Sequence, residues 1–354
     1  MYIGDVHDGS GLHHLLWELV ANVLDEHLAG HATQLVVALE ADGSASVEDD
    51  GRGIPVELRG DRGGTHLEVV MTTLCAGSKL DSRHRHVHVG LHGVGLAAVN
   101  AVCSTMTVTV ARDGHLHRQS FGRGVPVSSL EVVGRTSKRG TRVEIRPDDT
   151  IFTRTDFDGN LVRERLGELA ALLPGLRVRF FDKRTELTSP GIGDLARRLA
   201  GNAKRVPHEP LRASSALGGW RALRALDGVP GVEVALFWTL SDEAPPALHG
   251  FVNMQRCDEG THVRALAGAM QPLLADIPPT QRTDLARCLA ARVGGVISVL
   301  HFDPRFGSPT RSRLESPDVA PVLGRTVSTA VERFVAERPD QALALVASAR
   351  ERSA

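Results

Sequence analysis

Apolar and polar positions along the chain recur with two periods, and these periods predict its main elements. Residues 17–26 carry apolar side chains at the three- and four-residue spacing of a helix with one buried face. Residues 34–40 and 44–48 alternate as strands do, and the Asp-Gly pair between them is typical of a hairpin turn. Residues 96–102, which are mostly apolar, predict a second helix. The first part of the chain therefore mixes helices with strands.

The second part of the chain predicts further elements of both kinds. Residues 232–238 and 293–302 read as strands, the latter buried. Helices are predicted at residues 262–274, 280–291, 319–336 and 339–352. Pro and Gly gather at residues 189–193, which favours a domain boundary there, and 354 residues suit two domains. We therefore predict domains at residues 1–190 and 191–354, with the strand at 232–238 opening the second domain.

Composition excludes some classes of protein without choosing a function. A hydrophobic content of 42% and a charged content of 23% suit a globular protein, and a net charge of −1 gives no overall attraction to nucleic acid or anionic membranes. The sequence has no signal peptide and no apolar run of membrane-spanning length, so we expect no membrane contact and a cytoplasmic location. The widely spaced Cys75, Cys103, Cys257 and Cys288 fit reduced thiols better than disulfides or a zinc site.

Two polar residues interrupt the predicted helix at 17–26. Glu18 and Asn22 are four residues apart, so they share one helix face beside the apolar stripe. A carboxylate in such a position can accept a proton from an attacking water, and an amide oxygen is a suitable ligand for Mg²⁺. This spacing alone equally fits a helix whose polar edge meets solvent.

Glycines mark two further segments that could bind a nucleotide. Residues 49–55 read Asp-Asp-Gly-Arg-Gly-Ile-Pro, in which glycines admit a flat ligand and a carboxylate can accept a hydrogen bond from an exocyclic amine. Residues 90–95 have glycine at the first, fourth and sixth positions and precede a predicted helix, whose backbone N–H groups can bind an anion. The chain has no GxxxxGK[ST] motif and no Rossmann glycine order. The segments together predict an ATP site that is not a Walker P-loop.

These segments, in this order, resemble the GHKL ATPases, and more narrowly the N-terminal half of the DNA gyrase B family of type IIA topoisomerases. The resemblance also rests on residues 1–5, 11–15, 71–79, 139–141, 258–262 and 303–311, so it covers nearly the whole chain. It implies an α+β fold, in which a GHKL (Bergerat-type) two-layer α/β sandwich is followed by an α/β transducer domain with a C-terminal helix. It also implies ATP and Mg²⁺ as ligands.

The resemblance implies a role for each matching residue. Glu18 would be the general base that activates water, and Asn22 would hold Mg²⁺. Asp49 would bind the adenine amine, with Thr141 sharing a water. Arg311 stands where the family places a lysine on the terminal phosphate, so its charge would favour the transition state. The other implied contacts to ATP are Gly53, Ile54, Pro55, Lys79, Gly90, Leu91, His92, Gly93, Val94, Gly95 and Arg112.

Several positions depart from the family pattern. Pro309 stands two positions before Arg311, where the family has Gln. The planar guanidinium of Arg311 also differs from a lysine ammonium, which would alter turnover. Ala21 replaces the Asp that usually precedes the metal-binding Asn, and Val89 replaces a lid glycine, which would stiffen the loop. The alternating histidines of residues 83–88 fit a basic lid better than a metal site.

The family continues into a TOPRIM domain and a DNA-binding tail, and it has an arm ahead of the residues that match Met1. We find no match to the TOPRIM domain, the tail or the arm in this sequence. Its single tyrosine, Tyr2, is not placed to attack DNA. We therefore expect a Mg-dependent ATPase that cannot cleave DNA alone, whose partners are ATP, a second copy on nucleotide binding, and DNA or topoisomerase subunits. The alternative is a catalytically weak module that binds nucleotide or inhibitor, acting as a decoy or regulator.

Overall fold

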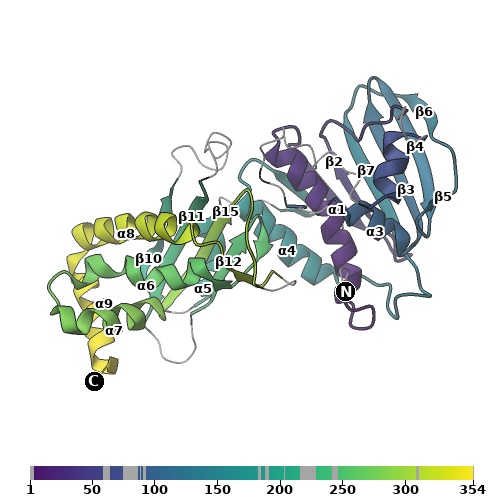
Figure 1. The fold of residues 1–354 in the computed structure, drawn as a ribbon. Coiled ribbons are helices and arrows are strands. Elements are labelled where there is room, and N and C mark those ends of the chain that lie inside the picture. Colours follow the sequence, from purple (N-terminus) through teal and green to yellow (C-terminus); the bar gives the residue numbers. More distant parts are fainter. Residues whose placement is uncertain are drawn as a thin grey trace. The chain divides into compact units, whose positions relative to one another are not determined.

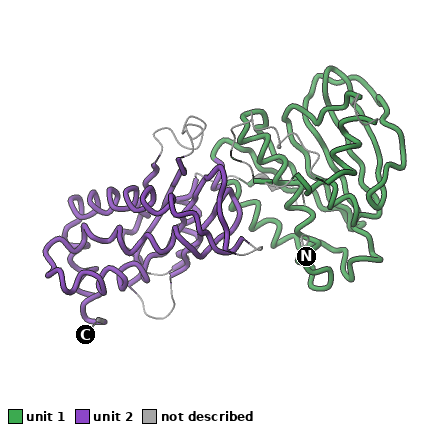
Figure 2. The backbone as a smooth tube through the Cα atoms, in the orientation of Figure 1, with its two compact units in different colours: residues 1–170, 174–188 green, residues 171–173, 189–354 purple. Residues whose placement is uncertain are grey.

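The computed structural model divides the chain into two compact units (Figure 2). Residues 1–170 and 174–188 form the first unit, and residues 171–173 and 189–354 form the second. The structure describes residues 4–58, 64–74, 87, 89–90, 93–181, 185–187, 191–202, 204–215, 229–240, 246–307 and 311–353.

The first unit is built on a mixed sheet that has nine strands among the described residues. The strand order is β5-β4-β3-β7-β2-β1-β8-β9, and β6 also pairs with β4. β1 and β8 are parallel, and the other neighbours are antiparallel. The strands are β1 (Gln34–Leu39), β2 (Ala45–Asp49), β3 (Cys103–Arg112), β4 (His115–Gly122), β5 (Val125–Pro126), β6 (Glu131–Arg135), β7 (Gly140–Pro147), β8 (Arg177–Phe181) and β9 (Thr185–Leu187).

The predicted hairpin of β1 and β2 is confirmed, and its turn has the expected chemistry. Val37 pairs with Val47 in the register of the two strands. Asp42 Oδ1 accepts hydrogen bonds from Ser44 N at 3.0 Å and Ser44 Oγ at 2.6 Å, and Gly43 has φ +82°. An Asp followed by a left-handed glycine closes such a turn at little steric cost, so the register is set locally.

Helices form the second layer of this unit. They are α1 (Ser10–Leu28), α2 (His66–Thr72), α3 (Gly95–Ala101) and α4 (Gly159–Leu172). α1 packs on β1 and β2, α3 packs on β3 and β4, and the two helices contact each other, so they cover the same face of the sheet (Figure 1). Their apolar stripes, such as Leu12, Leu15 and Leu19 of α1, are buried against it. The two-layer α/β sandwich implied by the resemblance is therefore confirmed.

The second unit has a five-stranded sheet in the order β10-β11-β15-β12-β13. Among its described strands, β12 and β15 run parallel and the other neighbours antiparallel. Its elements are α5 (Ile192–Ala200), β10 (Arg205–Ser214), β11 (Gly231–Thr239), β12 (Leu248–Val252), β13 (Gln255–Arg256), β14 (Glu259–Gly260), α6 (Thr261–Ala269), a 3-10 turn (Gln271–Leu274), α7 (Pro279–Ala290), β15 (Val293–Leu300), β16 (Arg313–Leu314), α8 (Val319–Glu337) and α9 (Pro339–Ser353). The short β14 and β16 pair separately.

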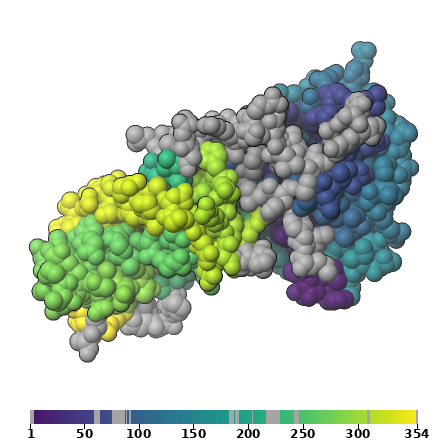
Figure 3. All heavy atoms as spheres, viewed as in Figure 1, coloured from purple at the N-terminus to yellow at the C-terminus, as the bar shows by residue number. Residues whose placement is uncertain are grey.

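Helices α6, α7, α8 and α9 share one apolar core with the sheet of the second unit. Trp238 of β11 stacks on Phe334 of α8 with ring centroids 5.6 Å apart, and both side chains are almost fully buried. α6 and α8 pack side by side, and their side chains meet on the face seen in Figure 3. A large buried aromatic pair of this kind fixes how a helix sits on a sheet.

Two predictions for the second part of the chain were wrong. The strand at 232–238 exists as β11, but α5 and β10 precede it, so it does not open the second unit. The helix predicted over residues 262–274 ends at Ala269 and is followed by a 3-10 turn. Pro272 explains the break, because proline has no N–H to continue an α-helix and its ring clashes with the preceding turn.

Within the described residues, none of the helices is long and apolar enough to cross a membrane. Cys103, Cys257 and Cys288 carry free thiols. Cys75 lies outside the described residues.

Candidate active site

The predicted pair on the first helix lies on one face of α1. The Asn22 Nδ2 group donates a hydrogen bond to the Glu18 carbonyl oxygen at 2.7 Å. Because the carbonyl oxygen can only accept, the amide nitrogen must face it, and the amide oxygen points the other way. That oxygen is the atom that could bind a metal. His14 Nε2 lies 3.4 Å from Glu18 Oε1, one turn earlier on the same helix. Three consecutive turns of α1 thus contribute polar side chains to one stripe.

Glu18 also meets the end of the glycine segment at residues 90–95. α3 begins at Gly95, and the Glu18 carboxylate lies so close that a Cβ at this glycine would overlap Oε2. A larger residue here would therefore have to displace the Glu18 carboxylate from its present position. The fold brings together two segments that the sequence analysis could link only by resemblance.

The Asp49 carboxyl lies at the end of β2, where the residue is partly buried. Burial, with a smaller contribution from Glu26, raises the pKa of Asp49 to about 7. A hydrogen bond from Gly51 N to Oδ1, 2.7 Å long, opposes that rise only in part. A carboxyl that titrates near neutrality can accept a hydrogen bond from an amine as an ion, or donate one as a neutral acid.

Gly53 and Ile54 close one side of the region around Asp49. Gly53 has φ +76°, and a Cβ there would meet the Ala111 carbonyl oxygen at 3.0 Å. Ile54 N donates a hydrogen bond to Thr141 Oγ1 at 3.1 Å. These contacts hold the Gly53-Ile54-Pro55 segment against β3 and β7, so a flat ligand beside Asp49 would meet backbone.

Arg112 and Gly140 complete this region from β3 and β7. Arg112 Nη1 donates to the Gly53 carbonyl oxygen at 2.9 Å, and its Nη2 lies 3.4 Å from Glu57 Oε1. The Gly140 backbone lies directly against the Asp49 carbonyl, leaving no room for a Cβ. The predicted residues Asp49, Gly53 and Arg112 therefore belong to one cluster, which Thr141 joins through Ile54.

Three acidic residues near this cluster were missed by the sequence analysis. Asp25 of α1 is buried, and it accepts hydrogen bonds from Val89 N at 2.6 Å and Gly90 N at 3.4 Å. It therefore attaches the start of the glycine segment to α1. Its position, seven residues after Glu18 and three after Asn22, continues the same helical stripe, and that spacing was the available signal.

The other two missed residues are Glu26 and Asp50. Burial disfavours the charged form of Glu26, but two hydrogen bonds from Arg52, at 2.7 and 3.1 Å, outweigh it and hold the pKa of Glu26 below its usual value. Asp50 accepts hydrogen bonds from Thr33 N at 2.6 Å and Gln34 N at 2.8 Å, which fixes the start of β1. Asp50 therefore has a structural explanation.

Some predicted site residues lie away from the Asp49 cluster or outside the described residues. Gly93 and Val94 lead into α3, with Gly93 at φ +63°. Arg311 belongs to the second unit, where its Nη1 donates to Gln255 Oε1 at 3.0 Å. Outside the described residues lie Lys79, Leu91, His92 and the histidines of residues 83–88.

The fold and the arrangement of these residues correspond to a known class of protein. Residues 7–151 match the family described as histidine kinase-, DNA gyrase B-, and HSP90-like ATPase. The two-layer sandwich with its polar stripe on α1 thus places the first unit in this class of ATPases. Residues 191–354 match the family described as DNA gyrase B.

Individual relatives point to a narrower family within this class of ATPases. The DNA gyrase B protein of Thermotoga maritima is 34% identical over 352 residues, covering 96% of this chain and 54% of that protein. The DNA gyrase B protein of Archaeoglobus fulgidus is 39% identical over 364 residues, covering 98% and 55%. The 43K ATPase domain of Thermus thermophilus gyrase B, solved in complex with an aminocoumarin, has a TM-score of 0.76 and 31% identity, covering 99% of this chain and 91% of that one.

The chain belongs to the DNA gyrase B family. It spans about half the length of the curated relatives it matches.

Proposed function

We propose that this chain binds Mg·ATP and hydrolyses it, with Glu18 as the general base. The observation that carries the proposal is the contact between the Glu18 carboxylate and Gly95, at the end of the glycine segment. A carboxylate beside a phosphate-binding segment repels the ligand's negative charge, so binding alone does not explain its presence. Accepting a proton from the attacking water does explain it. His14, 3.4 Å away, would orient the carboxylate.

Asn22 fits the role of a magnesium ligand. Its Nδ2 is engaged with the helix backbone, so its amide oxygen is the atom that would face a metal, and Mg²⁺ accepts an uncharged hard oxygen together with phosphate oxygens and water. When bound, Mg²⁺ would offset the charge of the phosphates. The adjacent turn of the same helix carries the proposed base, which would bring metal and water to one place.

The cluster around Asp49 would bind adenine. Its carboxylate would accept a hydrogen bond from the exocyclic amine, Thr141 would share a water, and the backbone from Gly53 to Pro55 would line the base. Arg112 would hold that backbone in place through its bond to the Gly53 carbonyl. The glycine segment at 90–95 and Lys79 would wrap the phosphates, and Arg311 would stabilise negative charge on the terminal phosphate in the transition state.

At the level of the whole protein, we propose that residues 1–190 act as the ATPase domain and residues 191–354 as a transducer. The relatives are named as a subunit of DNA gyrase, which supports a chain that works with other subunits and with DNA. ATP-dependent pairing of two copies would couple hydrolysis to such an assembly.

Phosphate release from ATP, measured with and without Mg²⁺ over a series of protein concentrations, tests this proposal. We expect Mg-dependent release by the wild type and at least a hundredfold less by Glu18→Ala, within the usual range for a lost general base. Release that rises faster than linearly with protein concentration would support pairing, whereas linear release would indicate an active monomer. A wild type that binds ATP without releasing phosphate would overturn the hydrolytic role.

A further inference from the structure

Gln255 has no part in the proposed chemistry, yet its side chain contacts the residue proposed to meet the terminal phosphate. Arg311 Nη1 donates a hydrogen bond to Gln255 Oε1 at 3.0 Å, although the two residues lie 56 positions apart. Both belong to the second unit, so this contact is internal to one compact body. The contact therefore shows how Arg311 is held within the second unit.

The hairpin that carries Gln255 is tied down at its turn. Asn253 and Met254 form the turn between β12 and β13, with φ values of +46° and +63°. Asn253 Nδ2 donates to the His301 carbonyl oxygen at 2.8 Å, and His301 N donates back to Asn253 Oδ1 at 2.8 Å. This reciprocal pair attaches the turn to the end of β15, so Gln255 follows a fixed point.

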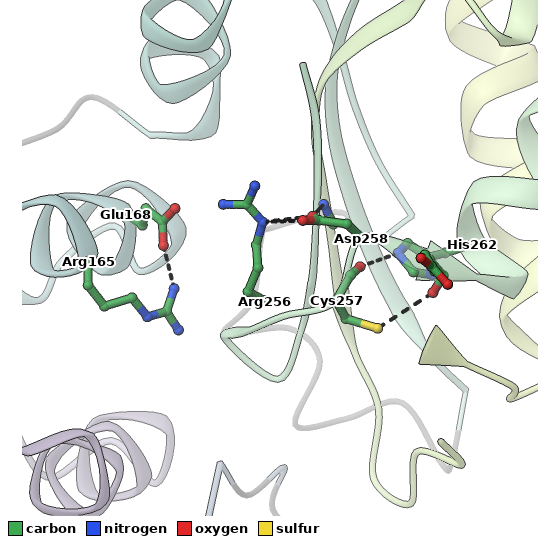
Figure 4. A network of polar contacts seen from close by, with 8 residues as sticks. Arg165, Glu168, Arg256, Cys257, Asp258 and His262 are labelled. Carbon is green, nitrogen blue, oxygen red and sulfur yellow. Dashed lines mark hydrogen bonds and ion pairs between the residues drawn. The ribbon is translucent and has the colours of Figure 1, made fainter. Parts of the chain in front are cut away.

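The residues just after Gln255 are held equally firmly. Arg256 Nε donates to Asp258 Oδ1 at 2.7 Å, and Figure 4 shows the two side chains facing each other. The same Oδ1 accepts a hydrogen bond from Gly250 N at 2.9 Å, and the Arg256 guanidinium lies 5.6 Å from the centroid of the Phe251 ring. The backbone of Gln255 is thus constrained from both directions, which makes it a rigid support for its side chain.

Arg311 itself is held in a defined direction. Its backbone has φ +56°, and its guanidinium lies 6.0 Å from the centroid of the Phe306 ring. The Gln255 amide is neutral, so its bond to Arg311 orients the guanidinium without cancelling the charge. A carboxylate in the same position would neutralise that charge.

We propose that Gln255 is a positioning residue for Arg311. By holding the guanidinium, it would reduce the side-chain freedom that Arg311 must lose when it meets the terminal phosphate in the transition state. This inference rests on the proposed ATPase function. Because this contribution would act mainly in the transition state, its loss should lower kcat and leave KM nearly unchanged.

The test is steady-state ATP hydrolysis by Gln255→Ala and Gln255→Glu. We expect about a tenfold lower kcat for Gln255→Ala, with KM changed by less than about twofold. Gln255→Glu keeps the size and an acceptor oxygen but adds a negative charge, so its kcat should fall at least as far. Gln281→Ala is the matched control, because Gln281 is an exposed residue of α7 in the same unit. Thermal unfolding of each variant checks that the fold is kept.

A double-mutant cycle adds a readout that a purely structural role would not move. In an Arg311→Ala background, Gln255→Ala should cause no further loss of kcat, because the residue it supports is already gone. Unchanged kcat for Gln255→Ala in an active wild type, or a loss that persists without Arg311, would overturn the role of Gln255 alone. A wild type without any ATP hydrolysis would overturn the ATPase proposal, and this inference with it.

Discussion

At the residue scale, the proposed contact between Asp49 and adenine would link protonation to ligand binding. Its pKa of about 7, raised mainly by burial, brings the ionisation of this carboxyl into the neutral pH range. An adenine amine donates its hydrogen bond best to the ionised form, so ligand binding favours loss of the proton. We therefore expect the nucleotide Kd to fall as pH rises from about 6 to about 8.

Calorimetric titration of wild type and Asp49→Asn with a non-hydrolysable ATP analogue checks this prediction. The ligand's own phosphate ionisation affects both proteins, so the difference between their pH profiles isolates Asp49. The variant should bind more weakly at the higher pH and show a flatter profile. Identical profiles would mean that Asp49 does not meet the ligand as an anion.

The contacts of Asp25 lead to a second prediction, which concerns the affinity for ATP. Its carboxylate is the acceptor for the N–H groups of Val89 and Gly90, and Asp25→Asn would replace one acceptor oxygen with a donor that faces them. We expect KM for ATP to rise by about tenfold to 150-fold, corresponding to the loss of roughly one hydrogen bond to a charged group. Asp276→Asn, at an exposed position of the second unit, is the control. A normal KM for Asp25→Asn would show that the glycine segment does not need this attachment.

At the element scale, the junction of α1 and α3 allows a direct test of the proposed site. Gly95→Ala would introduce a Cβ into the space of the Glu18 carboxylate, so either the base or the start of α3 must move. We expect kcat to fall by about a hundredfold, because a base displaced by about 1 Å loses its alignment. Gly324→Ala in α8, where a Cβ would meet nothing, should leave kcat unchanged. Full activity of Gly95→Ala would separate Glu18 from the chemistry.

Elements with a strong local signal could be predicted from the sequence, and contacts over long separations could not. The stripe of α1 and the Asp42-Gly43 turn follow from periodicity and turn chemistry alone. By contrast, the partners of Asp25 lie 64 residues further on, and no local pattern specifies a bond between a side chain and a distant backbone N–H. The 3-10 turn after α6 lies between these cases, because Pro272 is a local signal against an α-helix whereas the apolar residues around it favour one.

At the scale of the whole molecule, two units with separate cores should respond differently to nucleotide. The proposed ligand residues on α1, β2 and β7 all belong to the first unit, whereas Arg311 belongs to the second. Ligand at about 100 times its Kd stabilises the unit that binds it by about 2.7 kcal/mol. We therefore expect calorimetry to show a larger rise for the first unit's transition. Trp17 lies in the first unit, so the unfolding transition whose fluorescence signal is lost in Trp17→Phe is that of the first unit. An equal rise in the unfolding temperatures of both units would contradict this expectation.

The most direct test of the central claim compares binding and turnover in Glu18→Gln. This substitution keeps the size and hydrogen-bonding capacity of the side chain but removes its ability to accept a proton. If Glu18 is the general base, the variant should bind Mg·ATP with a Kd no weaker than that of the wild type, while its kcat falls by at least about a hundredfold. Turnover equal to that of the wild type would contradict the account, because α1 would then carry no base.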